Sequence, residues 1–219
     1  IINGVIRFRT DSGYATSFAK QWSKFQLNQY DSVNGTNLYR DRYLRETKWA
    51  PRGLDGEFVL EAGCGAGAFT CHLLKTGCNL VAIDYGHAVD IAKKHNCSDR
   101  GIFAQADILD MPFVENCFDR VFCHGVIQHT PNPKETFKAL TRVLKPGGKL
   151  VLVNMTKAER LGAGLYERIY RIYPLVMGGC RGVQQNNILT EYGFKVITRE
   201  YVQQMLFPSE VILATKLSD

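Results

Sequence analysis

Short runs of apolar residues recur along the chain from residue 57 onward, and segments with a helical pattern separate them. The runs are continuous rather than alternating, which is typical of strands that are buried on both faces of a sheet. Five of them predict strands, at Phe58–Glu61, Asn79–Asp84, Gly101–Gln105, Phe118–His124 and Lys149–Asn154. Three intervening stretches predict helices, at Ala68–Thr76, His87–Lys94 and Pro133–Leu144. Strands that alternate with helices predict a parallel, doubly wound α/β sheet.

The C-terminal part of the chain has a different order of elements. Residues 157–177 predict one or two helices, and two apolar runs follow at Lys195–Tyr201 and Val211–Lys216, with only a loop around Pro208 between them. Two strands so close in sequence must pair antiparallel, because a parallel pair needs a crossover of about a dozen residues or more. We therefore expect the α/β sheet to end in an antiparallel hairpin.

The first 50 residues are rich in aromatic side chains and have a helical pattern. Phe18, Trp22 and Phe25 stand at positions i, i+4 and i+7, which form one face of a helix. This face either packs on the main sheet or covers a ligand, and in the second case Trp22 is a candidate to contact the substrate. We expect an N-terminal helical lid over residues 1–50 and one compact domain over residues 51–219.

Composition adds limits on the class of protein. Hydrophobic residues make up 45% and charged residues 22% of the chain, which is typical of a globular protein. No apolar run approaches the roughly 20 residues of a membrane span, and the N-terminus does not resemble a secretory signal. The chain begins with Ile rather than Met, as a fragment of a longer protein would.

Charge and cysteine content indicate the partners and the compartment. The chain has 27 Lys and Arg against 21 Asp and Glu, a formal net charge of +6, but the basic residues are spread out and do not favour a nucleic-acid partner. The seven cysteines include no C-x-x-C pair, so we expect buried thiols, no metal site and a cytoplasmic location.

A glycine-rich loop follows the first of the parallel strands. Gly63 and Gly65 permit a tight turn and let the backbone approach a ligand, and Gly67 allows the next helix to pack closely. Asp84 ends the second strand, 21 positions after Gly63, where a carboxylate can accept both ribose hydroxyls of a nucleoside. Gly63-x-Gly65-x-x-Ala68 also satisfies the dinucleotide fingerprint. The loop alone is therefore compatible with an NAD-dependent oxidoreductase as well as with an enzyme that binds another nucleoside cofactor.

Three later features separate these two alternatives. Asp107 follows the third strand, where it can accept a hydrogen bond from an adenine amino group; Asp119 introduces the fourth strand; and Pro146-Gly147-Gly148 ends a helix and turns into the fifth strand. Five segments together resemble the class I S-adenosylmethionine-dependent methyltransferases, namely VLEAGCGAG, VAIDYG, AQADILDMPF, FDRVFCHGVIQHT and LKPGGKLVLV. The subgroup they resemble most contains the ubiquinone and menaquinone biosynthesis methyltransferases.

The resemblance implies a fold and a cofactor. The fold is a Rossmann-like, doubly wound seven-stranded sheet of order 3-2-1-4-5-7-6, in which strand 7 is antiparallel. The cofactor is S-adenosyl-L-methionine, and the residues implied to bind it are Glu61, Gly63, Cys64, Gly65, Gly67, Asp84, Tyr85, Asp107, Ile108 and His124. By resemblance, Glu61 and the glycine loop would hold the methionine part and Asp84 the ribose. Asp107 and Ile108 would bracket the adenine, and His124 and Gly125 would border the methionine part and the reaction site.

Methyl transfer from a sulfonium is an in-line displacement, in which alignment of the reactants can contribute roughly 7–11 kcal/mol. A base is needed only if the nucleophile must lose a proton, and it then adds about 10²–10⁴-fold. His129, just after the fourth strand, is the best candidate for this base, or else it is a structural residue. His124 is a second catalytic candidate, or else it only shapes the cofactor site. A methyltransferase-fold binding module without catalysis remains an alternative.

The two flanks resemble different relatives. The start, INGVIRF followed by SFAKQWSKFQLNQYD, resembles bacterial methyltransferases that carry a zinc-ribbon segment upstream. The tail, with LYERIYRIYP and QMLFPSEVILATK, resembles lipid and phosphatidylethanolamine N-methyltransferases. Residues 157–176 are basic and amphipathic, so they face the core or make a peripheral contact with anionic lipid. Tyr166 and Tyr170 are candidates for a pocket that binds a cationic amine. The expected acceptor is a small molecule or lipid with an O, N or C nucleophile.

Overall fold

The computed structural model describes the chain except for residues 10–26, 157–171, 173–182, 184–185, 205–206 and 219. The three candidate substrate residues Trp22, Tyr166 and Tyr170 lie outside the described residues. The same is true of the Phe18–Phe25 helix face and of nearly all of the predicted helical stretch 157–177.

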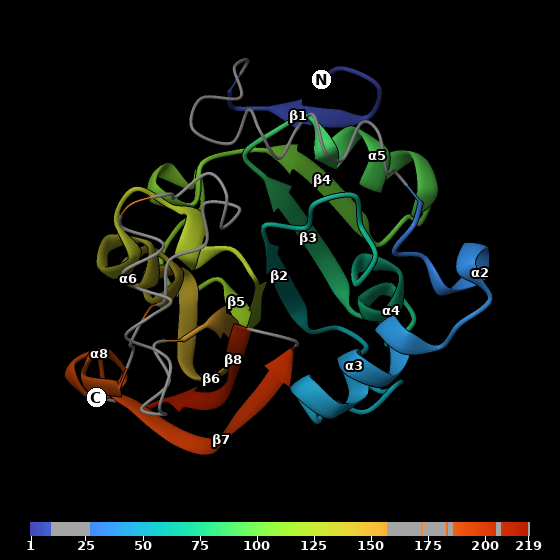
Figure 1. Ribbon diagram of the computed structural model, residues 1–219. Helices are drawn as coiled ribbons and strands as arrows, with labels where there is room; N and C mark the ends of the chain where they lie inside the picture. Colours follow the sequence, from blue (N-terminus) through green and yellow to red (C-terminus); the bar gives the residue numbers. More distant parts are fainter. Residues whose placement is uncertain (10–26, 157–171, 173–182, 184–185, 205–206, 219) are drawn as a thin grey trace.

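One eight-stranded sheet crosses the molecule in the order β1-β4-β3-β2-β5-β6-β8-β7 (Figure 1). The strands are β1 (Val5–Arg7), β2 (Phe58–Ala62), β3 (Asn79–Asp84), β4 (Gly101–Gln105), β5 (Phe118–His124), β6 (Leu144–Met155), β7 (Phe194–Gln204) and β8 (Phe207–Lys216). Strands β1 to β6 pair in parallel, and β8 is antiparallel to both β6 and β7. From β4 to β7 the order is the predicted 3-2-1-4-5-7-6, so the predicted fold class and the antiparallel strand are confirmed.

The sheet has one strand more than the seven expected. Val5–Arg7 pairs in parallel with Phe103–Gln105 of β4 and covers what would otherwise be the edge of the sheet. A run of three residues is too short to show a strand period, so this strand depends on its partner rather than on its own pattern. The hairpin also differs in detail from the expectation, because Pro208 pairs with Gln203 inside β8 instead of lying in the loop.

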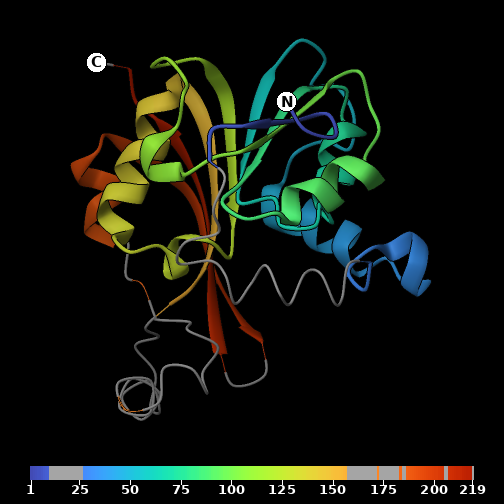
Figure 2. The same cartoon turned by 90° about the horizontal axis from the view of Figure 1, so that it is seen from above.

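Helices cover both faces of the sheet (Figure 2). They are α2 (Asp31–Asn34), α3 (Leu38–Thr47), α4 (Thr70–Leu74), α5 (Ala88–His95), α6 (Pro133–Val143) and α8 (Asn186–Glu191). On one face α6 and α8 bury Phe137, Leu140 and Leu189, and on the other face α3 and α4 bury Tyr43 and Leu73. These two cores fix the sheet between its helical layers, so its strand ends are held in place.

Local sequence signals explain where the helices begin and end. Helix α6 starts where the Asn132 side chain accepts a hydrogen bond from the Glu135 N–H at 3.3 Å, with Pro133 in the first turn. Helix α3 ends at Lys48, which adopts the left-handed conformation with φ 53°. Trp49 then turns into the core beside the sheet, at 6% exposure. The described part of the N-terminal segment therefore packs on the sheet through Tyr43 and Trp49.

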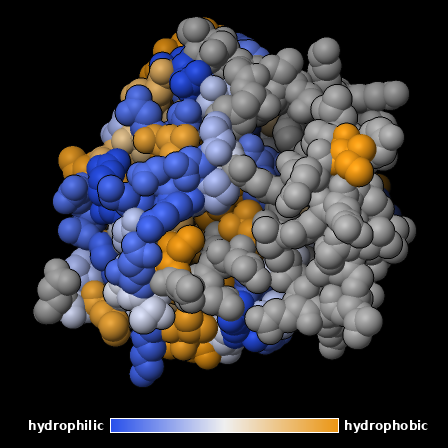
Figure 3. Space-filling view, turned by 60° about the vertical axis from the view of Figure 1, so that its left-hand side comes forward, coloured by the Kyte–Doolittle hydropathy of each residue, from blue (hydrophilic) through white to orange (hydrophobic). Residues whose placement is uncertain are grey.

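The described surface is mixed in polarity. On the face in Figure 3 it is mainly hydrophilic, with hydrophobic patches that are separated from one another. Within the described residues, no helix combines the length and the apolar character that a bilayer span requires. Cys64, Cys78 and Cys123 are buried as expected, whereas Cys97 is exposed because it follows the surface helix α5.

Candidate active site

The glycine loop connects β2 to α4 through a turn that its glycines make possible. The N–H groups of Gly63 and Cys64 both donate to the carbonyl of Ile83, at 2.8 and 2.9 Å, and so tie the loop to the end of β3. Gly63 has φ 83°, and a Cβ there would lie 2.9 Å from Val126 Cγ1 and closer still to Cγ2. No larger residue fits this turn unless its neighbours shift, which explains the first glycine of the motif.

A cavity of about 310 Å³ opens beside this loop, at the carboxyl ends of β2, β3 and β5. Ligands of open parallel sheets bind at this edge. Eight of the ten predicted cofactor residues line the cavity: Glu61, Gly63, Cys64, Gly65, Asp84, Tyr85, Ile108 and His124. The predicted base His129 lines it as well. Ala68 of the fingerprint and Gly125 after His124 line it too. Lining residues that the sequence analysis did not single out are Gln29, Tyr39, Arg42, Phe69, Val126 and Thr130.

The two remaining cofactor candidates, Gly67 and Asp107, are not among the residues that line the cavity. A Cβ on Gly67 would lie 2.5 Å from Asn96 Nδ2 and 2.8 Å from Ala92 Cβ, so Gly67 serves the close packing expected of it. The Asp107 carboxylate accepts a hydrogen bond from Leu109 N–H at 2.9 Å and lies 3.7 Å from the Arg9 guanidinium. Asp107 therefore caps the 3-10 turn that presents Ile108 to the cavity.

Two carboxyl groups face the cavity, of which Glu61 is buried and Asp84 is half-buried. Glu61 is 2% exposed and accepts a hydrogen bond from Thr70 Oγ1 at 2.6 Å. Burial raises the pKa of Glu61 to about 8. The hydrogen bond from Thr70 opposes this rise, and the charge of Asp84 adds to it. Burial also raises the pKa of Asp84, although the N–H groups of Gly86 and Gly65 donate to it at 2.8 and 2.9 Å. Such a pair gains most from a ligand that brings positive charge and hydrogen-bond donors.

Helix α3 contributes a polar cluster that touches His124 at the end of β5. Arg42 Nη2 lies 2.8 Å and Glu46 Oε2 lies 3.1 Å from His124 Nε2. Glu46 is only 1% exposed, and its Oε1 accepts a hydrogen bond from Arg42 Nε at 3.1 Å. Burial alone would raise the pKa of Glu46, but the contacts with His124 and Arg42 outweigh it and lower that pKa. The sequence analysis missed Arg42 and Glu46, and the only signal for them was their i, i+4 spacing.

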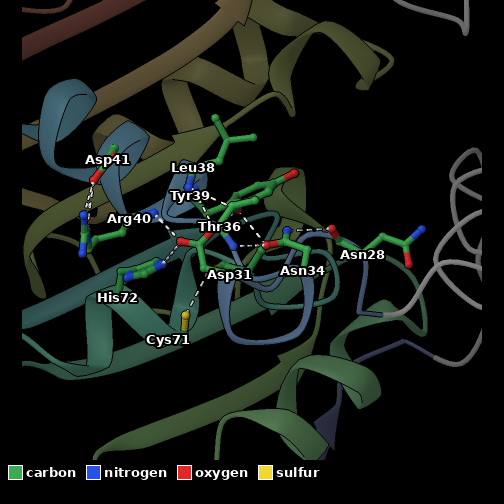
Figure 4. A network of polar contacts seen from close by, with 11 residues as sticks. Asn28, Asp31, Asn34, Thr36, Leu38, Tyr39, Arg40, Asp41, Cys71 and His72 are labelled. Carbon is green, nitrogen blue, oxygen red and sulfur yellow. Dashed lines mark hydrogen bonds and ion pairs between the residues drawn. The ribbon is translucent and has the colours of Figure 1, made fainter.

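A second network anchors the start of α3 (Figure 4). The Asp31 carboxylate accepts hydrogen bonds from the N–H groups of Tyr39 and Arg40, at 3.0 and 2.8 Å, and from Thr36 Oγ1 at 3.0 Å. Burial would raise the pKa of Asp31, yet these hydrogen bonds outweigh it and hold the pKa below its usual value. The first N–H groups of α3 are thus satisfied by a charged cap, which fixes the helix that carries Arg42.

His129 reaches the cavity from the 3-10 turn Ile127–His129 that follows β5. Its Nε2 lies 3.3 Å from Gln128 Nε2, and Gln128 Oε1 accepts a hydrogen bond from Met155 N–H at 2.8 Å. The turn is therefore attached to β6. The structure brings His129 and His124 to one cavity, as the sequence predicts, and leaves the catalytic role of each as a prediction.

Comparisons with known proteins identify the domain. Residues 60–152 match a family model described as Methyltransferase domain. The sterol 24-C-methyltransferase of Saccharomyces cerevisiae is 31% identical over 172 residues, which are 76% of this chain and 43% of that protein. The ubiquinone biosynthesis O-methyltransferase of Pseudomonas aeruginosa is 32% identical over 137 residues, 59% of this chain and 56% of the relative. The chain thus spans about half the length of these relatives.

A solved structure agrees with the fold. A putative methyltransferase from Bacillus halodurans superposes with a TM-score of 0.67 at 18% identity, covering 81% of this chain and 98% of that one. The matched segment 60–152 contains the glycine loop, Asp84, Asp107 and both cavity histidines. The comparisons favour a methyltransferase over an NAD-dependent oxidoreductase. The chain therefore contains a methyltransferase domain, and the matched segment, the relatives and the fold support a class I S-adenosylmethionine-dependent methyltransferase with S-adenosylmethionine as its cofactor.

Proposed function

We propose that the protein transfers the methyl group of S-adenosylmethionine to a small-molecule or lipid-like acceptor. The observation that carries this proposal is the pair of carboxyl groups, the buried Glu61 and the half-buried Asp84, in one cavity with the glycine loop. The cofactor brings a positively charged amino group and two ribose hydroxyls, which can donate hydrogen bonds to these carboxyl groups in addition to their donors within the protein. When bound, it supplies a methyl group that its sulfonium activates.

The residues would divide the cofactor among them. Glu61 would take the amino group of the methionine part, since its raised pKa falls when a cation binds beside it. Asp84 would accept hydrogen bonds from the ribose, with Tyr85 beside it, and Asp107 and Ile108 would bracket the adenine. The backbone of Gly63 and Gly65 leaves room for this approach because neither residue carries a side chain.

The acceptor side of the cavity is partly aromatic. Tyr39 and Phe69 line it together with His124, His129 and Thr130. The two relatives are named for sterol and ubiquinone methylation, and aromatic walls suit flat, largely apolar acceptors of that kind. His129 would remove a proton from an acceptor that carries one. Trp22, Tyr166 and Tyr170 remain candidates to contact the acceptor, and residues 157–176 remain a candidate contact with a lipid surface.

The proposal is tested in two steps. Titration calorimetry with S-adenosylmethionine and S-adenosylhomocysteine should show that both bind. If neither compound binds, the proposed cofactor site is refuted. Transfer of labelled methyl groups is then measured with a panel of quinol, phenol, amine and lipid acceptors. Binding without transfer to any member of the panel would instead support the alternative, a binding module without catalysis.

A further inference from the structure

The cluster of Arg42, Glu46 and His124 occupies one of the two ring nitrogens of the histidine. Both residues of α3 approach Nε2, Arg42 at 2.8 Å and Glu46 at 3.1 Å. A guanidinium has only hydrogen-bond donors, so in the Arg42 contact Nε2 must be the acceptor. A neutral imidazole whose Nε2 accepts carries its proton on Nδ1.

Glu46 Oε2 also lies near Nε2, at 3.1 Å, and has no other hydrogen-bond partner among the described residues, so the assignment depends on Arg42 making the shorter contact. The other oxygen of Glu46 binds the guanidinium. Glu46 Oε1 already accepts from Arg42 Nε at 3.1 Å, and Arg45 Nη2 lies 3.4 Å from the same oxygen. The carboxylate therefore orients the guanidinium, and the guanidinium makes the closer contact with the ring. At 1% exposure Glu46 is shielded from water, which strengthens the ion pair that holds this arrangement.

The imidazole ring is held on its face as well as on its Nε2 edge. The centroid of the Phe69 ring lies 4.6 Å from that of His124, and the Phe122 ring stacks at 6.0 Å with 30° between the planes. Within the described part of the chain, His124 Nδ1 makes no hydrogen bond, while the side chain is 18% exposed and lines the cavity. The proton-bearing nitrogen is thus the one left for a ligand.

We propose that His124 is a fixed N–H donor to an oxygen atom of the methyl acceptor, that Arg42 is the positioning residue that selects this tautomer, and that Glu46 orients Arg42. The proposal rests on the proposed function and names its substrate class. An oriented N–H group stabilises negative charge on oxygen, so the site favours acceptors with a phenolate, enolate or carbonyl oxygen over acceptors with an ammonium group. Because Nδ1 already carries a proton, His124 does not remove one from the acceptor, and His129 is left for that step.

Long-range ¹H–¹⁵N correlation spectra distinguish the two neutral tautomers of histidine. The chain has five histidines, so the His124 signals can be assigned from their loss in His124→Gln. In the wild-type protein at mildly alkaline pH we expect the pattern of an Nδ1–H tautomer. An Nε2–H pattern in the wild-type protein would overturn the proposal without recourse to any variant.

Two variants of α3 test the cause of the tautomer. Arg42→Leu should move the proton to Nε2, where it can be donated to Glu46. Glu46→Gln should leave it on Nδ1, because Arg42 still donates, and is the matched control on the same helix. An unchanged tautomer in a folded Arg42→Leu protein would show that Arg42 does not set it.

The acceptor chemistry is tested with two small probes added to the protein saturated with S-adenosylhomocysteine. Millimolar 4-nitrophenolate should shift the His124 Nδ1–H signal, and benzylammonium should not. An equal shift with both probes, or no shift with the phenolate, would overturn the preference for oxygen. Failure to bind S-adenosylhomocysteine would refute the proposed function instead, and the tautomer would still be measurable without it.

Discussion

Replacement of Gly63 by alanine should destabilise the protein through two effects that can be measured separately. The first is backbone strain, because Gly63 has φ 83°, and the left-handed region costs a residue with a side chain roughly 1–2 kcal/mol. The second is a clash, since the new Cβ would lie 2.9 Å from Val126 Cγ1 and closer to Cγ2. Overpacking of this kind costs roughly 1–3 kcal/mol. The free energy of unfolding should therefore fall by about 2–5 kcal/mol in total.

Gly56 provides a matched control for the strain. It has the same φ of 83°, but a Cβ there would meet nothing within 4 Å. Gly56→Ala should therefore lose only the backbone contribution, roughly 1–2 kcal/mol. The difference between the two variants measures the contact with Val126.

A double variant tests the contact directly. Val126→Ala removes both Cγ atoms, which leaves only the Val126 Cβ, at 3.1 Å, near the new methyl group. In the Gly63→Ala/Val126→Ala protein the two substitutions should be coupled by about 1–3 kcal/mol in the stabilising direction. Urea unfolding followed by tryptophan fluorescence gives these values, with the buried Trp49 as a probe. Equal losses for Gly63→Ala and Gly56→Ala, or additive losses in the double variant, would refute the steric argument.

Three further changes test the carboxyl groups and the loop support. Asp84→Ala should weaken binding of S-adenosylhomocysteine by about 1–3 kcal/mol, because the ribose hydroxyls lose their acceptor and the N–H of Gly65 loses its partner. Unchanged affinity in calorimetry would show that Asp84 does not bind the ribose. Glu61, whose pKa burial raises to about 8, is protonated in the folded apo protein and ionised in the unfolded chain between pH 5 and 8. The stability of the apo protein should therefore fall as pH rises through this range, by at most about 1.4 kcal/mol per pH unit, and the fall should be smaller in Glu61→Gln. Equal pH profiles of the two proteins in urea titrations would contradict this assignment. Tyr30→Phe leaves the buried Asn96 amide without its hydroxyl partner at 2.7 Å, so the unfolding free energy should fall by about 1–2 kcal/mol, and an unchanged midpoint would show that this bond contributes nothing.

The fold could be predicted from the sequence largely because its strands are continuous apolar runs. Strands β3, β4 and β5 begin and end where the pattern places them, since each is a mostly apolar run bounded by polar or glycine residues. The antiparallel end of the sheet followed from the short connection between β7 and β8. The strand β1 could not be predicted, because Val5–Arg7 becomes a strand only by pairing with β4, which lies almost a hundred residues away in sequence.

The site divides in the same way between local and tertiary signals. Glu61, Asp84 and His124 could be found because each ends or adjoins a predicted parallel strand, and the ends of such strands meet at one edge of the sheet. Glu46 could not, because the charge-rich sequence of α3 indicates a solvated helix, and a carboxylate is almost never fully buried unless it is paired. The partner of Glu46 on the same helix, Arg42, is visible in the i, i+4 spacing. The burial of Glu46 also depends on His124, which only the folded chain brings beside it. The buried charge of Glu46, on a helix whose sequence looks solvent-exposed, therefore points to the contribution of the N-terminal segment to the site. Glu46 holds Arg42 four residues before it, and Arg42 contacts His124.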